Sequence, residues 1–292
     1  MRYGIICLIT FQLGIFSTTA SGGTIYNNLT PNNSMAIATR PGSGTFEIEA
    51  GDDFFLGAPS SINAASFVGL IVPGPTGGTP SISDVVAEIY RVFPLDSNAV
   101  RTPNVPSRAN SPSDVALDSR DSGANELSFS TSILAPTFTV LNSVQPGGIH
   151  PSPSQNTHGN GPLTGEEVQI DLTFNTPINL PPDHYFFVPQ VELTDGATFY
   201  WLSASRPISG AGITPFPAGV NDLQAWTRDA HLDPDWLRVG TDIVGGSPAP
   251  MFNTAFSLEG DVTPEPGTTL VVLAGLALIG VRRFAELRAR VR

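Results

Sequence analysis

Carboxylates are the most abundant groups in this sequence that could do chemistry. The chain of 292 residues carries 26 acidic side chains against 14 basic ones, all arginine, for a formal net charge of −12. Asp52–Asp53 follow a glycine, and Asp233 and Asp235 flank a proline, so both pairs stand in turn-like sequence. Ca²⁺ takes six to eight oxygen ligands from such loops. Both pairs are candidate ligands of a structural calcium ion, with solvated acidic loops as the alternative.

Catalytic motifs are missing from the sequence. Neither the Gly-x-Ser-x-Gly turn of serine hydrolases nor the His-Glu-x-x-His helix of zinc proteases occurs. A glycosidase needs two carboxylates across one glycosidic bond, but acidic residues are so common here that no pair stands out. We therefore expect a non-catalytic protein without a cofactor, apart from the candidate calcium.

The three tryptophans offer a second kind of site. Trp201, Trp226 and Trp236 fall in the last third of the chain, the last two beside charged residues. Sugar-binding β-proteins stack pyranose rings on exposed tryptophan and place polar groups around them. The three residues are thus a candidate glycan platform. The alternative, which we favour, is that these rings fill the ends of a hydrophobic core.

Charge and cysteine content narrow the class further. Residues 21–263 hold eight arginines against 24 acids, a balance of 8 − 24 = −16, which repels nucleic acid. We expect no nucleic-acid partner. The only cysteine is Cys7, so the region after it can form no internal disulfide.

The elements that must position these residues read as strands. Short apolar runs alternate with Gly, Pro and Asn clusters, and no long segment shows a helical period. The expected strands are 44–50, 53–56, 64–72, 85–93, 126–132, 138–141, 168–174, 185–193, 198–203 and 253–259. This pattern predicts an all-β fold, an antiparallel β-sandwich that is jelly-roll-like or Ig-like. Tyr185–Val188 is apolar on both faces and is predicted to be a central strand.

Both ends of the chain resemble addressing segments. Residues 1–20 have a charge at Arg2, an apolar run and a small-residue exit, the pattern of a secretory signal peptide cut by signal peptidase. Residues 21–262 then form the exported β-sandwich domain. We expect one domain, although the polar segment 94–125 could be a linker between two.

The last thirty residues, 263–292, form a distinct tail. Residues 268–281 are apolar and predict a short hydrophobic helix of roughly 21 Å, less than the ~30 Å hydrocarbon core of a bilayer. Arg282 and Arg283 follow at once and indicate the cytoplasmic side. A span this short suits a transient membrane anchor.

Pro264, Glu265 and Pro266, followed by the apolar segment and the arginine pair Arg282–Arg283, resemble the PEP-CTERM sorting domain of exported bacterial proteins. The resemblance implies a membrane enzyme of the exosortase type as partner and cleavage near the motif. The protein would be membrane-anchored transiently and then reside in the cell envelope or outside the cell.

The exported region is itself similar to an uncharacterised group of PEP-CTERM proteins, through residues 184–191, 200–204, 235–242 and 255–260. That similarity implies no activity. We therefore expect a non-catalytic envelope or extracellular-matrix protein, associated with exopolysaccharide. The alternative is a glycan-binding module or a glycan-active hydrolase.

Overall fold

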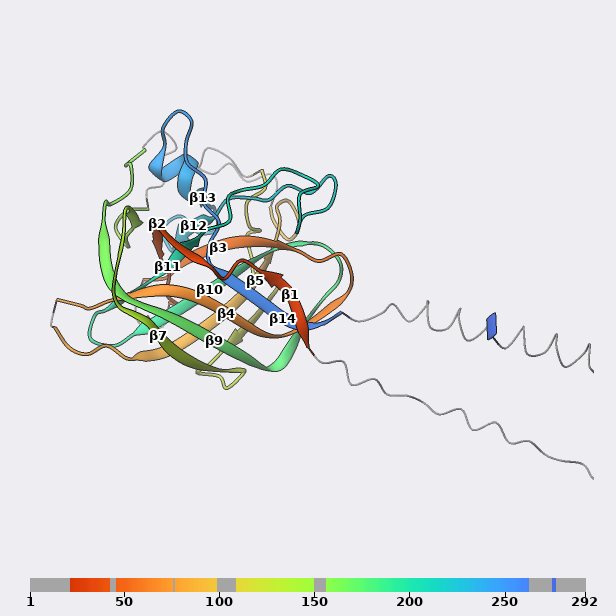
Figure 1. The fold of residues 1–292 in the computed structure, drawn as a ribbon, viewed down its shortest axis with the longest axis horizontal. Coiled ribbons are helices and arrows are strands. Elements are labelled where there is room, and N and C mark those ends of the chain that lie inside the picture. Colours follow the sequence, from red (N-terminus) through yellow and green to blue (C-terminus); the bar gives the residue numbers. More distant parts are fainter. Residues whose placement is uncertain are drawn as a thin grey trace, which may run out of the picture.

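The computed structural model describes residues 22–42, 46–75, 77–98, 109–149, 156–262 and 275–276. These residues are mostly β-strand and form two sheets, so the all-β prediction is confirmed (Figure 1). The first sheet contains β1 (Gly23–Asn27), β2 (Pro31–Ala38), β4 (Ser60–Val72), β7 (Leu127–Val140), β8 (Ser143–Val144), β9 (Leu163–Leu180), β11 (Thr198–Ala204) and β14 (Phe256–Val262).

The second sheet has the order β13-β12-β3-β10-β5-β6. Its strands are β3 (Ile48–Phe55), β5 (Ile82–Arg91), β6 (Asp118–Asp121), β10 (His184–Leu193), β12 (Trp226–Asp229) and β13 (Leu237–Arg238). A short helix, η1 (Val239–Val244), follows β13. All strand pairs are antiparallel except β2 with β8.

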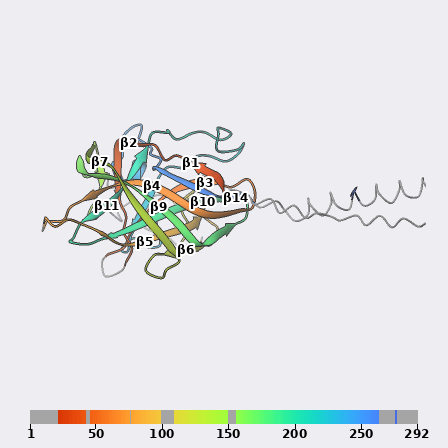
Figure 2. The same ribbon diagram turned by 60° about the horizontal axis from the view of Figure 1, so that its bottom comes forward.

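Strand β4 organises the first sheet. One edge of β4 pairs with β9, while the other edge pairs first with β14 and then, from Gly69 onward, with β11. At its far side the sheet curls back, because the amide of Leu141, just after β7, donates to the carbonyl of Asn33 in β2 at 2.7 Å. The first sheet is therefore a half-barrel, whose curvature is visible from two directions (Figures 1 and 2).

Aromatic side chains fill the space between the sheets. Phe187 of β10 stacks on Phe256 of β14 with ring centroids 5.3 Å apart, and its edge contacts Trp201 of β11 at 6.1 Å. Tyr185 and Phe187 face this core, whereas Phe186 and Val188 face a second apolar cluster on the opposite side of the sheet. Strand β10 lies between β3 and β5, which confirms the predicted central strand.

Residues Asp52 and Asp53 lie inside a strand rather than in a turn. The sequence predicted two strands, 44–50 and 53–56, separated at Gly51, but β3 runs without a break through Gly51, Asp52 and Asp53. Gly51 fits because β10 packs closely against it: a Cβ there would lie 3.0 Å from Val188. Burial between neighbouring strands on both sides thus outweighs the turn preference of Gly-Asp-Asp.

The first and last strands of the domain pair with each other. Strand β1 runs antiparallel to β14 with Gly23 opposite Gly260, so the two ends leave the same edge of the first sheet (Figure 1). Of the predicted hydrophobic helix, residues 275–276 alone are described, while 1–20, Pro264–Pro266 and Arg282–Arg283 lie outside the described residues. Among the described residues, no helix is long and apolar enough to cross a membrane.

Candidate functional site

Several buried charged residues lie on the outer face of the second sheet, the face turned away from the first sheet. Side chains alternate along β3, and Glu49 and Asp53 point to this outer face. Two segments around residues 109–117 and 205–236 cover the face, so Leu223, Trp226 and Trp236 are buried with Tyr90 in a separate cluster. Charged side chains on this sheet are therefore held away from water by loops.

A buried ion pair occupies the centre of that face. Arg228 of β12 lies opposite Glu49 of β3, and they are 4% and 3% exposed. The Arg228 guanidinium makes a two-point contact with the Glu49 carboxylate, with Nη2 to Oε1 at 2.9 Å. The Tyr90 hydroxyl lies 2.7 Å from Glu49 and 3.0 Å from Glu88. Such bidentate geometry is the arrangement in which a buried pair offsets its desolvation.

Burial sets the proton affinities in this network. It raises the pKa of Glu88 to about 8, and the negative charge of Glu49 adds to the shift. Burial also raises the pKa of Glu49, against the opposing effect of Arg228. Burial alone would lower the pKa of Arg228, but the Glu49 carboxylate outweighs it and keeps the guanidinium charged. Near neutral pH, Glu88 is thus the member of the network that exchanges a proton.

Trp236 and its neighbouring aspartates belong to the same network. The Arg228 guanidinium carbon lies 4.3 Å from the Trp236 ring centre, and the indole N–H donates to the Ser113 carbonyl at 3.1 Å. Asp233 pairs with Arg228 at 2.9 Å, while Asp235 is buried. The structure therefore uses Asp233 to neutralise an arginine; the candidate calcium loop is part of a protein ion pair.

Asp52 and Asp53 point to opposite sides of the sheet. Asp52 faces the core, where its Oδ2 accepts hydrogen bonds from the Thr254 amide at 2.6 Å and hydroxyl at 3.0 Å. Asp53 accepts from the Leu223 amide at 3.1 Å and lies 2.5 Å from His184 Nε2. The prediction that they form adjacent ligands in a turn is wrong, because both residues lie within strand β3, where consecutive side chains point to opposite faces. Within the described ranges, no group of three or more His, Cys, Asp or Glu residues could hold a metal ion.

A third buried acid lies beside these two. Asp222 accepts from Arg206 at 2.9 Å and from the Ser209 amide at 3.1 Å. Burial raises the pKa values of Asp52 and Asp53, and the neighbouring carboxylates raise them further. Burial lowers the pKa of His184 to about 4. Burial thus favours the uncharged forms of Asp52, Asp53 and His184, whereas Arg206 opposes the effect of burial on the pKa of Asp222.

The predicted glycan platform is wrong in this fold. Trp201, Trp226 and Trp236 are 0%, 2% and 1% exposed, so none presents a ring face to solvent. Trp201 lies between the sheets and donates to the Ala255 carbonyl at 3.0 Å. The three rings fill the core and the covered outer face, the alternative that the sequence favoured.

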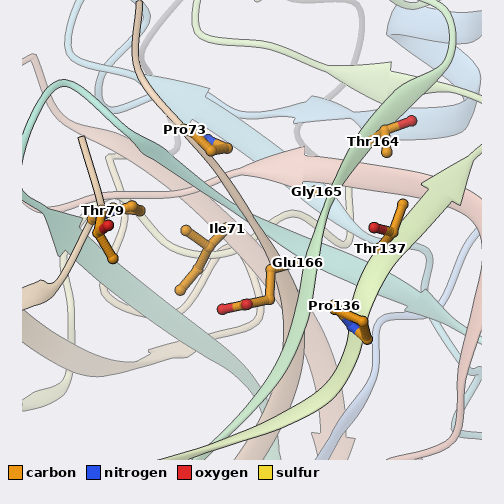
Figure 3. Close-up of a pocket in the computed structure, with 9 residues that line it drawn as sticks. Ile71, Pro73, Thr79, Pro136, Thr137, Thr164, Gly165 and Glu166 are labelled. Atoms are coloured by element: carbon orange, nitrogen blue, oxygen red, sulfur yellow. The ribbon is translucent and has the colours of Figure 1, made fainter. Parts of the chain in front are cut away.

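The described residues line open cavities on the surface, among them the following two. The Asp222 cavity, about 290 Å³, is lined by Ser209, Asn221, Asp222, Gln224, Trp226 and Arg238 among others. The Glu166 cavity, about 310 Å³, lies among β4, β7 and β9, with Glu166 beside Ile71 and Thr137 near Thr164 (Figure 3). A Cβ on Gly165 would lie 2.7 Å from the Ile71 carbonyl oxygen, so glycine permits the two strands to approach there.

Sequence reasoning missed Glu49, Glu88, Arg228 and Asp222 as site residues. The available signal was weak: Glu49 stands in an alternating strand pattern in which every second residue is expected in solvent. Only the covering loops make that face an interior. The chain has arginine but no lysine, which is consistent with bidentate pairing to carboxylates but does not reveal the partners.

Comparisons of this chain with known proteins found no match. No protein-family model matches the chain. No curated protein and no solved structure matches it either.

Proposed function

We propose that this protein is a non-catalytic exported component of the cell envelope or extracellular matrix. In this proposal signal peptidase removes residues 1–20, and an exosortase-type enzyme cuts the PEP-CTERM tail at 263–292. The two sheets form a sandwich of jelly-roll-like or Ig-like type, and residues 268–281 form the apolar helix. Outside the membrane the released domain associates with exopolysaccharide.

The pairing of β1 with β14 is the observation that carries the proposal. The last strand ends at Val262, one residue before the tail, and the first begins at Gly23, just after the signal. Every residue of β14 that pairs with β1 or β4 lies within 256–262, before the tail begins. Removal of both ends would therefore leave the two-sheet core intact, as a transient anchor requires.

The charge distribution supports the same location. Cleavage near Pro266 removes five arginines, so the released domain is more acidic than the whole chain. A strongly acidic surface keeps a protein soluble and attracts divalent cations. Both properties suit a matrix component.

The proposal is tested by replacing Pro264, Glu265 and Pro266 with alanine in the natural host. We expect the variant to stay in the membrane fraction with its tail attached, while Glu286→Ala, in the same tail but outside the motif, is processed normally. Normal processing of the triple variant would contradict the sorting role.

A glycan-binding module is the second candidate, and the Asp222 cavity is the observation that favours it. Its charges are matched, since Asp222 pairs with Arg206 at 2.9 Å and Arg238 with Asp242 at 2.7 Å. The cavity also contains amide side chains at Asn110 and Asn221. A charge-balanced, amide-rich cavity suits a neutral hydroxylated ligand, because each sugar hydroxyl both donates and accepts.

Ligand-observed NMR with neutral monosaccharides tests this candidate. We expect millimolar binding that Asn221→Ala weakens by about fivefold, the loss of one neutral hydrogen bond. Thr137→Ala, in the Glu166 cavity, is the matched control. Binding that is absent, or equal in both variants, would exclude the Asp222 cavity as a glycan site.

A further inference from the structure

We propose that a second copy of this chain pairs antiparallel with the free edge of β7, so that the first sheets of two molecules join into one. The dimer would be two-fold symmetric and centred on Thr131. This inference rests on the geometry of β7 and is independent of how the protein is sorted.

Along Leu127–Ile133, one edge of β7 has no described strand hydrogen-bonded to it; the sheet curls back onto β2 at the other end of β7, where Leu141 donates to Asn33. The strand is 14 residues long and pairs only with β9, as far as the described chain extends. Its other edge offers backbone N–H and C=O groups in a row, the template on which another strand can pair. In the second sheet, by contrast, the inner strands each lie between two neighbours, and the outer strands β6 and β13 span only four and two residues.

The side chains of β7 are also uncovered. Ile133 is 62% exposed and Leu134 48%, and Phe129 is half-buried. Across the pair with β9, Ile133 stands opposite Val168, which is fully buried. The apolar face of the sheet thus continues past the part that the second sheet covers, and its last strand is left in water.

The first half of β7 lacks the devices that usually protect an edge strand. Natural edges carry charges, prolines or bulges. From Leu127 to Val140 there is no charged residue, in a chain whose net charge is −12. Pro136 and the two irregularities of register all lie in the second half, beyond Ile133. The first half, Leu127–Ile133, is regular and open.

The sequence of this half is self-complementary about Thr131. In an antiparallel pair centred there, Phe129 of one copy stands opposite Ile133 of the other, and Ser130 opposite Ser132. Aromatic against β-branched residues is a favourable cross-strand pair, and two serines can hydrogen-bond. Both Phe129–Ile133 contacts fall on the apolar face, so pairing would bury the exposed strip of both molecules.

Repulsion between the copies is small in this arrangement. The nearest carboxylates on the outer face, such as Asp171, belong to β9, which would lie three strand spacings, about 14 Å, from β9 of the other copy. That distance exceeds the screening length of about 8 Å at physiological salt. Salt added above the physiological level should therefore change the dimer little, whereas it weakens association between opposite charges.

Sedimentation velocity on the protein recovered from its exporting host tests the proposal. We expect a dimer, and we expect Ile133→Lys to raise its dissociation constant at least about tenfold, because two charges would enter the shared strip. The unfolding midpoint of Ile133→Lys should stay near that of the wild type, since the side chain is exposed. A monomeric wild-type protein, or a dimer that tolerates Ile133→Lys, would overturn the proposal.

Cysteine cross-linking tests the register and does not depend on the lysine variant. Thr131→Cys places two thiols directly opposite each other, within reach of a disulfide. We expect mild oxidation to link Thr131→Cys chains into dimers but not Ser119→Cys chains, whose thiol lies on β6, an outer strand of the other sheet. Any link through Cys7 would appear equally in both and in the wild type. Equal cross-linking of the two variants would contradict the β7 pairing.

Discussion

Buried charge is the dominant feature at the scale of single residues. Glu49, Asp52, Asp53 and Asp222 are all buried, and each has a partner that can be named. Taking a carboxylate out of water costs several kcal/mol unless geometry and hydrogen bonds offset it. In this fold Arg228 offsets the cost for Glu49, and raised pKa values reduce it for Asp52 and Asp53.

Removing the charge of Glu49 should destabilise the protein strongly. Glu49→Gln leaves the buried Arg228 with only the half-exposed Asp233 as counter-ion, and we expect the free energy of unfolding to fall by about 3 kcal/mol. Urea denaturation at pH 7 measures it. Glu259→Gln is the matched control on the exposed side of β14 and should change stability by less than about 0.5 kcal/mol. A small effect at Glu49 would mean that the carboxyl is already neutral in the folded protein.

The stability of the protein should depend on Glu88 through pH. Burial and the charge of Glu49 raise the pKa of Glu88 from 4.5 to about 8. Between these values the folded state binds more protons than the unfolded state, so the Glu88 contribution to stability declines as pH rises from 4.5 to 8. Glu88→Gln removes this decline. We expect the difference in unfolding free energy between Glu88→Gln and wild type to grow across that window and then level off.

That comparison isolates one group among several. Glu49, Tyr90, Glu47 and Arg228 all influence Glu88 electrically, but they remain in both proteins. His184, whose pKa burial lowers to about 4, has the opposite slope between 4 and 6.5 and cancels in the difference. A flat difference between pH 4.5 and 8 would show that Glu88 titrates normally.

At the scale of elements, local pattern predicted the strands that are packed on both faces and lost those that depend on partners. The stretch 185–193 was predicted almost to the residue, because Tyr185–Val188 is apolar throughout. Strand β2 was missed, since its first half, Pro31–Ser34, consists of turn-forming residues that the neighbouring β11 and the Leu141 amide hold extended. β7 was predicted as two strands because Pro136 interrupts it.

The candidate site was predicted less well than the fold. Side-chain type identified Asp52 and Asp53 as notable, but their partners come from residues more than a hundred positions away, such as Leu223 for Asp53. Sequence patterns carry no information on such distant pairs. The tryptophans illustrate the same limit, because exposure was the property that distinguished a glycan platform from a core.

A single glycine governs how β4 joins its neighbours. At Gly69 the partner of β4 changes from β14 to β11, and a Cβ there would lie 2.6 Å from the Tyr200 carbonyl oxygen and closer still to the Phe199 ring. We expect Gly69→Ala to lower the free energy of unfolding by about 1–3 kcal/mol. Gly23→Ala, where no atom lies within 4 Å of the added methyl, is the control and should be nearly neutral. Equal effects of both substitutions on thermal unfolding would contradict the close approach of β4 and β11.

At the scale of the whole molecule, the domain lies between two segments whose removal is predicted from the sequence and proposed above. The core between the sheets and the pairing of β1 with β14 involve residues 23–262 only. That arrangement supports our two proposals together, in which the tail holds a folded acidic domain at the membrane transiently, and the released domain pairs through β7.

Intact-mass spectrometry of the protein recovered from the outer surface of its host tests this account most directly. We expect a polypeptide that begins near Ser21 and ends within or near residues 263–267, without the arginines from Arg282 onward. Recovery at that surface of a chain that still extends through Arg292 would contradict it.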